Sequence, residues 1–158
     1  MSENKLIRER LAKHLEGGEA FLPVDKMLDE ISFSEINKRP KNLPYSFYEL
    51  FYHITFAQKD ILDFCVSEKY SEHNWPEDYW SENKECKTEK DWENLKADYF
   101  ETRKELKDFL LNFENGLTSP VKNGTNEQTL LREIILVIEH TAYHTGQMLI
   151  ILRLLNLH

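Results

Sequence analysis

The chain has 158 residues and a mass of 18.9 kDa, and its 28 acidic side chains outnumber the 20 basic ones, for a formal net charge of −8. This negative field repels phosphate backbones and anionic lipids, so we expect no nucleic acid and no membrane among its partners. The length and the 41% hydrophobic content predict one folded domain, residues 1–158, and exclude a disordered chain.

The sequence contains only five glycines and five prolines, the residues that most often interrupt secondary structure, which predicts long helices rather than many short strands. The apolar pattern predicts a first long helix over residues 3–16, ended by Gly17 and Gly18. Pro23 can open a short helix that runs to residue 30. Residues 32–44, which include two prolines, are predicted to be irregular.

Three further long helices are predicted over residues 46–66, 88–113 and 129–155. The first of them should begin in a capping box, in which Ser46 and Glu49 satisfy each other's backbone amides. A loop rich in aromatic side chains, residues 71–87, separates it from the next. The predicted fold is therefore all-α: a four-helix bundle with an extended crossover between the first two long helices and one or two short extra helices.

The helices predicted over residues 46–66 and 129–155 are apolar on both of their sides. Such a helix needs cover on both faces, which a second subunit could supply. Ala142 and Gly146 are four residues apart and would let a partner helix come close. We expect a homodimer through these reverse faces; the alternative is that the short helices and the aromatic loop cover them within one chain.

Three histidines are candidate ligands for a divalent metal ion. His140 and His144 are four residues apart, so both imidazoles project from one face of the last helix. Thr141 stands where a zincin HExxH helix has glutamate, so that motif is absent. A third ligand must come from another helix, and His53 on an apolar stripe is the natural candidate. The alternative is that these histidines are hydrogen-bonded core residues.

Two polar side chains accompany the histidines at helical spacing. Glu49, one turn before His53, could serve as a general base or as a partner of a ligand imidazole. It could instead serve the capping box, and one rotamer does not do both. Gln147, in the turn after His144, could orient that imidazole or a bound water.

The aromatic loop and the absence of other motifs narrow the chemistry further. The cluster from Trp75 to Trp80 either anchors the loop over the bundle or forms a wall of a substrate pocket. The sequence has no serine nucleophile elbow and no glycine-rich phosphate loop. Cys65 and Cys86 form no CxxC motif, and residues 1–5 lack the apolar run of a signal peptide, so we expect a cytoplasmic protein.

The histidine segments resemble a known family. Residues 139–147, Glu-His-Thr-Ala-Tyr-His-Thr-Gly-Gln, resemble the HxxYHxGQ signature in the last helix of DinB-like (DinB/YfiT) proteins. Residues 49–62 resemble the segment that holds this family's first metal-binding histidine. Residues 17–20, 75–80 and 129–133 are also similar to one branch of the family, so the resemblance covers nearly the whole chain.

The resemblance implies a four-helix bundle, often dimeric, with a three-histidine site for zinc or nickel, here His53, His140 and His144. Family members include transferases that use low-molecular-weight thiols and others described as metal-dependent hydrolases. We expect a metal-dependent enzyme of one of these two kinds that acts on a small molecule. The alternatives are a non-catalytic metal-binding or stress-response dimer and a metal-free binding module. Phe21 and Tyr45 replace histidines found in many relatives, which predicts altered chemistry.

Overall fold

The computed structural model describes residues 3–158, and over this range its regular structure is helical. The helices are α1 (Glu3–Glu16), α2 (Val24–Glu30), α3 (Phe47–Val66), α4 (Glu89–Asn112) and α5 (Leu130–Leu154), with a 3-10 helix η1 (Glu77–Tyr79). The all-α bundle predicted from the sequence is confirmed. The helix bounds differ from the predicted ones by one residue at most, at the capping positions.

Local hydrogen bonds explain where the helices begin and end. The Ser46 hydroxyl accepts the Glu49 N–H at 3.2 Å, and the Glu49 carboxylate accepts the Ser46 N–H at 2.8 Å, so the predicted capping box is present. Thr129 caps α5 by accepting a backbone N–H with its side chain. At the end of α1, Gly17 and Gly18 have φ values of +79° and +85°, a left-handed backbone that favours glycine.

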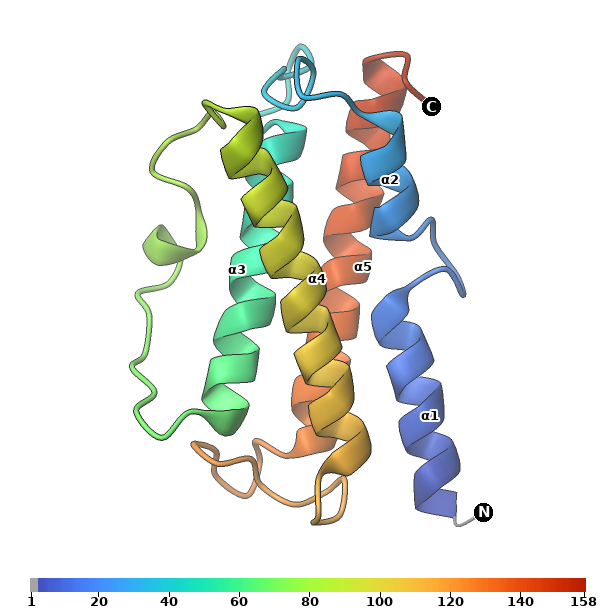
Figure 1. Cartoon of the computed structure of the whole chain (residues 1–158), viewed down its shortest axis with the longest axis vertical. Coiled ribbons are helices and arrows are strands. Elements are labelled where there is room, and N and C mark those ends of the chain that lie inside the picture. Colours follow the sequence, from blue (N-terminus) through green and yellow to red (C-terminus); the bar gives the residue numbers. More distant parts are fainter. Residues whose placement is uncertain (1–2) are drawn as a thin grey trace.

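The long helices lie side by side in a bundle, in which α3 packs against both α4 and α5 (Figure 1). The short α2 continues along the same side of the bundle as α1, so these two helices together occupy the fourth position. Residues 17–46, which contain α2, form the expected crossover between α1 and α3. A second long connection, residues 67–88, returns along the outside of α3, and therefore α3 and α4 run in the same direction.

The reverse face of α3 is covered within the chain. Phe51 is fully buried, and its ring centroid lies 5.1 Å from that of Trp92 and 5.3 Å from that of Tyr99, both on α4. This face of α3 is therefore covered within the chain by the long helix α4, and not by the short helices and the aromatic loop named as the alternative to a second subunit. The reverse face of α5 is covered only in part, because Ile135 and Ile150 remain 39% and 51% exposed.

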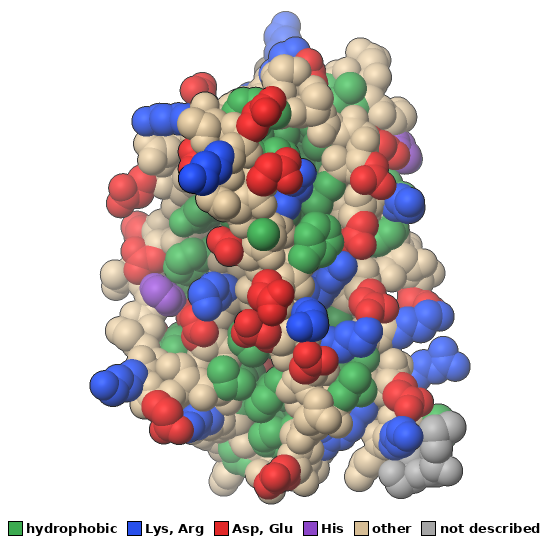
Figure 2. Space-filling view, in the orientation of Figure 1, with side chains coloured by type: hydrophobic (Ala, Val, Ile, Leu, Met, Phe, Trp, Pro, Cys, Tyr) green, Lys and Arg blue, Asp and Glu red, His purple; other side chains and the backbone are tan. Residues whose placement is uncertain are grey.

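The outer surface of the bundle is polar over α4. Figure 2 shows lysine and arginine side chains interspersed with aspartate and glutamate over this face. Mixed charges of this kind are typical of a solvated helix face. Within residues 3–158, no helix combines the length and the apolar character needed to cross a bilayer.

Candidate metal centre

The packing of α3 against α5 brings the three predicted histidines together. His53 lies in the middle of α3, and His140 and His144 lie on successive turns of α5, facing it. The Nε2 atoms of His53 and His140 are 3.0 Å apart, and one ligand nitrogen from each of the three rings lies within 4.8 Å of the others. His53 is 1% exposed and His144 is 8% exposed, while His140 is half-buried.

Hydrogen bonds to acceptor oxygens fix the tautomers of two of the rings. Nδ1 of His53 donates to the backbone carbonyl of Tyr79 at 3.0 Å, and Nδ1 of His144 donates to Oε1 of Gln147 at 2.6 Å. Because the Nδ1 atoms carry the protons, each Nε2 keeps its lone pair, and that of His53 faces Nε2 of His140 at 3.0 Å. Trp80 holds the His53 ring from one side, stacked at 4.2 Å between centroids and 4° between planes. Thus, the rings are held in place by their surroundings.

Burial keeps the three imidazoles neutral. It is the largest cause that lowers the pKa of His53, His140 and His144 below the ordinary histidine value. For His140 the pKa falls to about 4, because the charges of His144 and His53 oppose its protonation as well. Metal ions bind the neutral form of imidazole, so the three rings are in the ligand form at neutral pH.

These pKa shifts predict how the stability of the metal-free protein depends on pH. The unfolded chain binds a proton at each histidine near pH 6.5, whereas folded His140 does so only near pH 4. The unfolded state therefore holds more protons between these values, and the free energy of unfolding should fall as the pH falls from about 7 to about 4. Thermal unfolding followed by circular dichroism in a chelator tests this. The free energy of unfolding of a His140→Leu variant should depend less steeply on pH than that of the wild type. An equally steep dependence would contradict the lowered pKa of His140 as its cause.

The donor set fits a divalent cation such as zinc. Zinc takes imidazole nitrogens at about 2.0–2.1 Å in tetrahedral geometry, which places the nitrogens roughly 3.3 Å from one another. The separations among the three rings are compatible with this after small ring rotations. Nickel also accepts imidazole ligands. Three protein ligands leave a coordination position for a further molecule, as in catalytic zinc sites.

The structure places Glu49 in its capping role. Its carboxylate accepts the Ser46 N–H and two further hydrogen bonds, at 2.9 and 2.7 Å, from Nε and Nη2 of Arg39. The two family positions that depart from histidine, Phe21 and Tyr45, are half-buried, and neither lines the cavity beside the three histidines. A catalytic role for Glu49 and an effect of these two replacements both stay predictions.

A cavity of about 780 Å³ opens beside His140. Its walls come from α3, from the connection between α3 and α4, and from the loop and first turns of α5. The lining residues are Ala57, Asp60, Ile61, Phe64, Tyr70, Glu72, Trp75, Tyr79, Asn123, Gln128, Arg132, Glu133, Leu136 and His140. The aromatic loop therefore contributes a pocket wall through Trp75 and Tyr79, and Trp80 contacts a histidine of the site.

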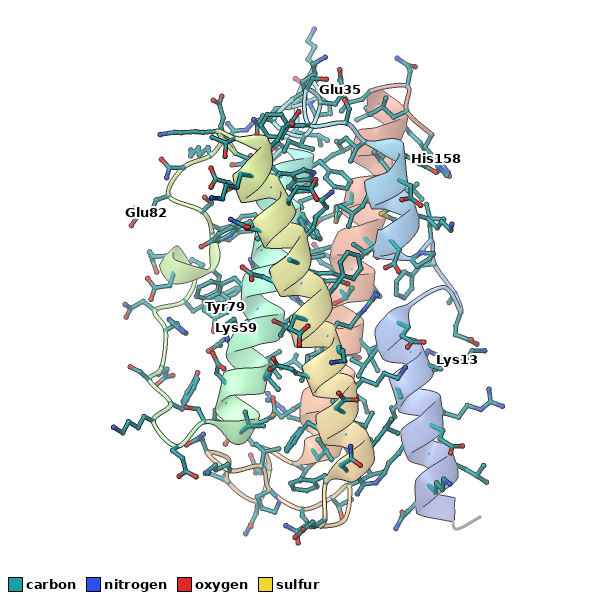
Figure 3. The ribbon with its side chains drawn as sticks, viewed as in Figure 1. Lys13, Glu35, Lys59, Tyr79, Glu82 and His158 are labelled. Carbon is teal, nitrogen blue, oxygen red and sulfur yellow. The ribbon has the colours of Figure 1, made fainter. Side chains whose placement is uncertain are left out.

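One link in this site was not expected from the sequence. Tyr79 lies between its loop and α3 (Figure 3), and its hydroxyl donates to the buried carboxylate of Asp60, which also accepts from the Tyr70 hydroxyl at 3.0 Å. The backbone carbonyl of the same Tyr79 orients His53. Asp60 lies seven residues, or two helical turns, after His53 on α3, a spacing that could have pointed to it, whereas a backbone acceptor leaves no sequence signal.

Gln147 gives a direct test of ring orientation. A Gln147→Leu variant removes the acceptor of the His144 Nδ1–H while keeping the size of the side chain. Loss of such a partner is expected to lower the affinity for Zn²⁺ by about 10–100-fold. Calorimetric titration measures this, with Gln128→Leu, which lines the cavity away from the histidines, as the matched control. Equal affinities for the wild type and the Gln147 variant would contradict the orienting role.

Imidazoles from two adjacent helices converge beside a cavity, which is the arrangement in which helical-bundle proteins place metal sites between facing helices. The sequence model of the DinB superfamily matches residues 24–148, and the chain belongs to this superfamily. The match includes α2, α3, α4 and all three histidines. Comparisons with curated proteins and with solved structures gave no match.

Proposed function

We propose that the chain binds one divalent metal ion, zinc or nickel, through His53, His140 and His144 and is an enzyme that acts on a small molecule. The observation that carries this proposal is the convergence of three neutral, pre-oriented imidazoles beside a cavity of about 780 Å³. Membership of the DinB superfamily supports the same proposal. Cavities of this size accommodate small-molecule ligands.

The chain's own residues position the ligands and shape the pocket. A bound divalent cation supplies Lewis-acid chemistry, which lowers the pKa of a coordinated water or thiol. Tyr79 and Gln147 fix the imidazole orientations through their oxygen atoms. Trp75 and Tyr79, with ring centroids 5.0 Å apart, line the pocket and offer apolar contact to a substrate.

Transfer of a thiol is favoured over hydrolysis because the buried carboxylates near the site are already engaged. Glu133 accepts a hydrogen bond from Arg132 at 2.7 Å, Asp60 accepts from two tyrosine hydroxyls, and Glu49 is held in its capping box. A hydrolase needs a general base that takes the proton of the attacking water. A thiol whose pKa is lowered ionises near neutral pH and is a strong nucleophile without such a base.

The test incubates protein loaded with zinc or nickel with glutathione, bacillithiol or mycothiol and an electrophile, alongside ester and amide probes. The proposal expects conjugation of a thiol by the wild type and its loss in the His144→Ala variant. His14→Ala, on the exposed side of α1, is the control and should keep full activity. Hydrolysis that depends on the same histidines would overturn thiol transfer, and metal binding without either activity would support the non-catalytic metal-binding or stress-response dimer.

We also propose that two copies of the chain pack through the uncovered face of α5. Ile135, Ile150 and Leu154 are exposed there to 39%, 51% and 54%, which is unusual for large apolar side chains on one helix. A Cβ added at Gly146 would meet no atom within 4 Å, so the helix backbone is open to close approach at this position. Burial of these side chains against a second copy would remove the apolar surface from water.

A further inference from the structure

The cavity beside the histidines has an unbalanced charge. Its lining contains three carboxylates, from Asp60, Glu72 and Glu133, and one guanidinium, from Arg132. The guanidinium donates to the Glu133 carboxylate at 2.7 Å, so these two charges offset each other. The remaining two carboxylates make the cavity a region of negative potential, within a chain of net charge −8.

Asp60 contributes a buried charge without a permanent counter-ion. It is only 8% exposed, and its two oxygens accept hydrogen bonds from the neutral hydroxyls of Tyr70 and Tyr79. Among residues 3–158, the one basic side chain within 4 Å of this carboxylate is His73, at 3.7 Å, which is charged only when protonated. A buried carboxylate gains free energy from a nearby cation, because the interior screens charges less than water does.

The tyrosine hydroxyls respond to the same negative field. Burial, then the hydrogen bond to Asp60 and the charges of Asp60 and Glu72, raise the pKa of Tyr70 to about 12. The Tyr70 phenol therefore remains a neutral donor. Neither tyrosine side chain carries a positive charge that could balance that of Asp60.

Aromatic rings complete the walls around these carboxylates. Phe64 and Tyr70 meet edge to face with centroids 5.2 Å apart, and Trp75 meets Tyr79 in the same way at 5.0 Å. The faces of such rings attract cations, most strongly when the cation has shed its water. Aromatic faces combined with carboxylates are the chemistry that recognises ammonium groups.

We propose that this cavity binds the cationic ammonium group of a small-molecule substrate, with the rest of the substrate directed toward the three histidines. This inference rests on the proposed function for the direction of the substrate, but binding of the ammonium group requires only the cavity. An anionic substrate is disfavoured, because it would have to draw Arg132 away from Glu133 and approach the two uncompensated carboxylates of Asp60 and Glu72.

The experiment compares three probes of nearly equal shape: choline, which is cationic, 3,3-dimethyl-1-butanol, which is neutral, and 3,3-dimethylbutyrate, which is anionic. The quaternary nitrogen of choline has no lone pair and does not ligate a metal ion. Binding to the metal-free protein is followed by the NMR signals of the tryptophan indoles, two of which, from Trp75 and Trp80, lie at or beside the cavity. Choline is expected to bind about tenfold more tightly than the alcohol, within the range of cation–π and ion-pair contributions, and the anion should be the weakest.

Two variants locate the binding. Glu72→Gln should weaken the binding of choline about 2–5-fold and leave that of the alcohol unchanged, because it removes one unit of charge from an exposed position. Glu77→Gln changes the charge of the same connection but not of the cavity lining, and should alter neither probe. Equal binding of choline and the alcohol, tighter binding of the anion, or no binding of choline would overturn the proposal.

A parallel titration with Zn²⁺ separates the two proposals. Choline bound by a protein that takes up no metal would overturn the metal-dependent enzyme and keep the ammonium site. Uptake of Zn²⁺ by a protein that does not prefer choline to the alcohol would overturn the ammonium site and keep the metal-dependent enzyme.

Discussion

Replacement of His140 by alanine is expected to lower the affinity for Zn²⁺ by more than about 100-fold, since loss of a partner outside the ligand set alone costs about 10–100-fold. His140 is one corner of a nearly equilateral triangle of imidazoles, with its ring centroid 4.8 Å from that of His53 and 4.5 Å from that of His144. Without it, two imidazoles remain on different helices and hold an ion much less tightly. Calorimetric titration and elemental analysis of protein without a histidine tag measure the effect.

The fold should survive this change, because the half-buried His140 side chain lies beside a cavity rather than in close-packed core. Circular dichroism should therefore show the helical content of the wild type. His73→Ala is the matched control, since His73 lies near the same cavity but outside the three-histidine cluster, and it should retain one equivalent of metal. One equivalent bound by the His140→Ala protein would exclude the three-histidine site.

Substitution of Gly146 by arginine is expected to weaken association of two chains by at least about 100-fold, since an unpaired charge buried in a dry interface costs several kcal/mol. The side chain at this position would extend into open space in the single chain, where its Cβ meets no atom within 4 Å. Replacing a glycine inside a helix also removes its conformational cost. The monomer should thus be as stable as before, or more stable, and only the dimer should be lost.

Sedimentation equilibrium at micromolar concentrations measures the association, and thermal unfolding of the variant measures its stability. Arg153→Ala is a useful control, because this exposed residue lies on the last turn of α5 and its loss removes a charge instead of adding one. A wild-type protein that sediments as a monomer would contradict the dimer. In that case the exposed isoleucines of α5 need another explanation.

The helices could be predicted from the sequence because the signals that define them are local. Apolar spacing, the Ser46–Glu49 capping box and the Gly17–Gly18 pair each act within a few residues, and the structure shows each of them in place. His140 and His144 could be paired because they are four residues apart on one helix. His53 could be added because it lies on the apolar stripe of a second helix that had to share the same core. The family resemblance pointed to the same three residues.

The surroundings of the histidines could not be predicted because they depend on contacts between distant segments. The Tyr79 carbonyl reaches His53 only after residues 67–88 have folded back along α3, and no side-chain pattern reports the direction of a carbonyl. The same holds for the course of this connection, which fixes the parallel arrangement of α3 and α4. Similarly, the double-sided apolar pattern of α3 did not distinguish cover by α4 from cover by a second chain.

The return of residues 67–88 along the outside of the bundle divides the site into two parts with different tolerance to change. The helices supply the histidines and must keep their packing against one another. The connection supplies the aromatic wall at Trp75 and Tyr79, and the packing of α3 against α4 and α5 is made by the helices themselves. Loops of this kind accept substitution and changes of length at little cost in stability. The ligand preference of such a protein can therefore diversify through the connection while the bundle and its three imidazoles stay fixed.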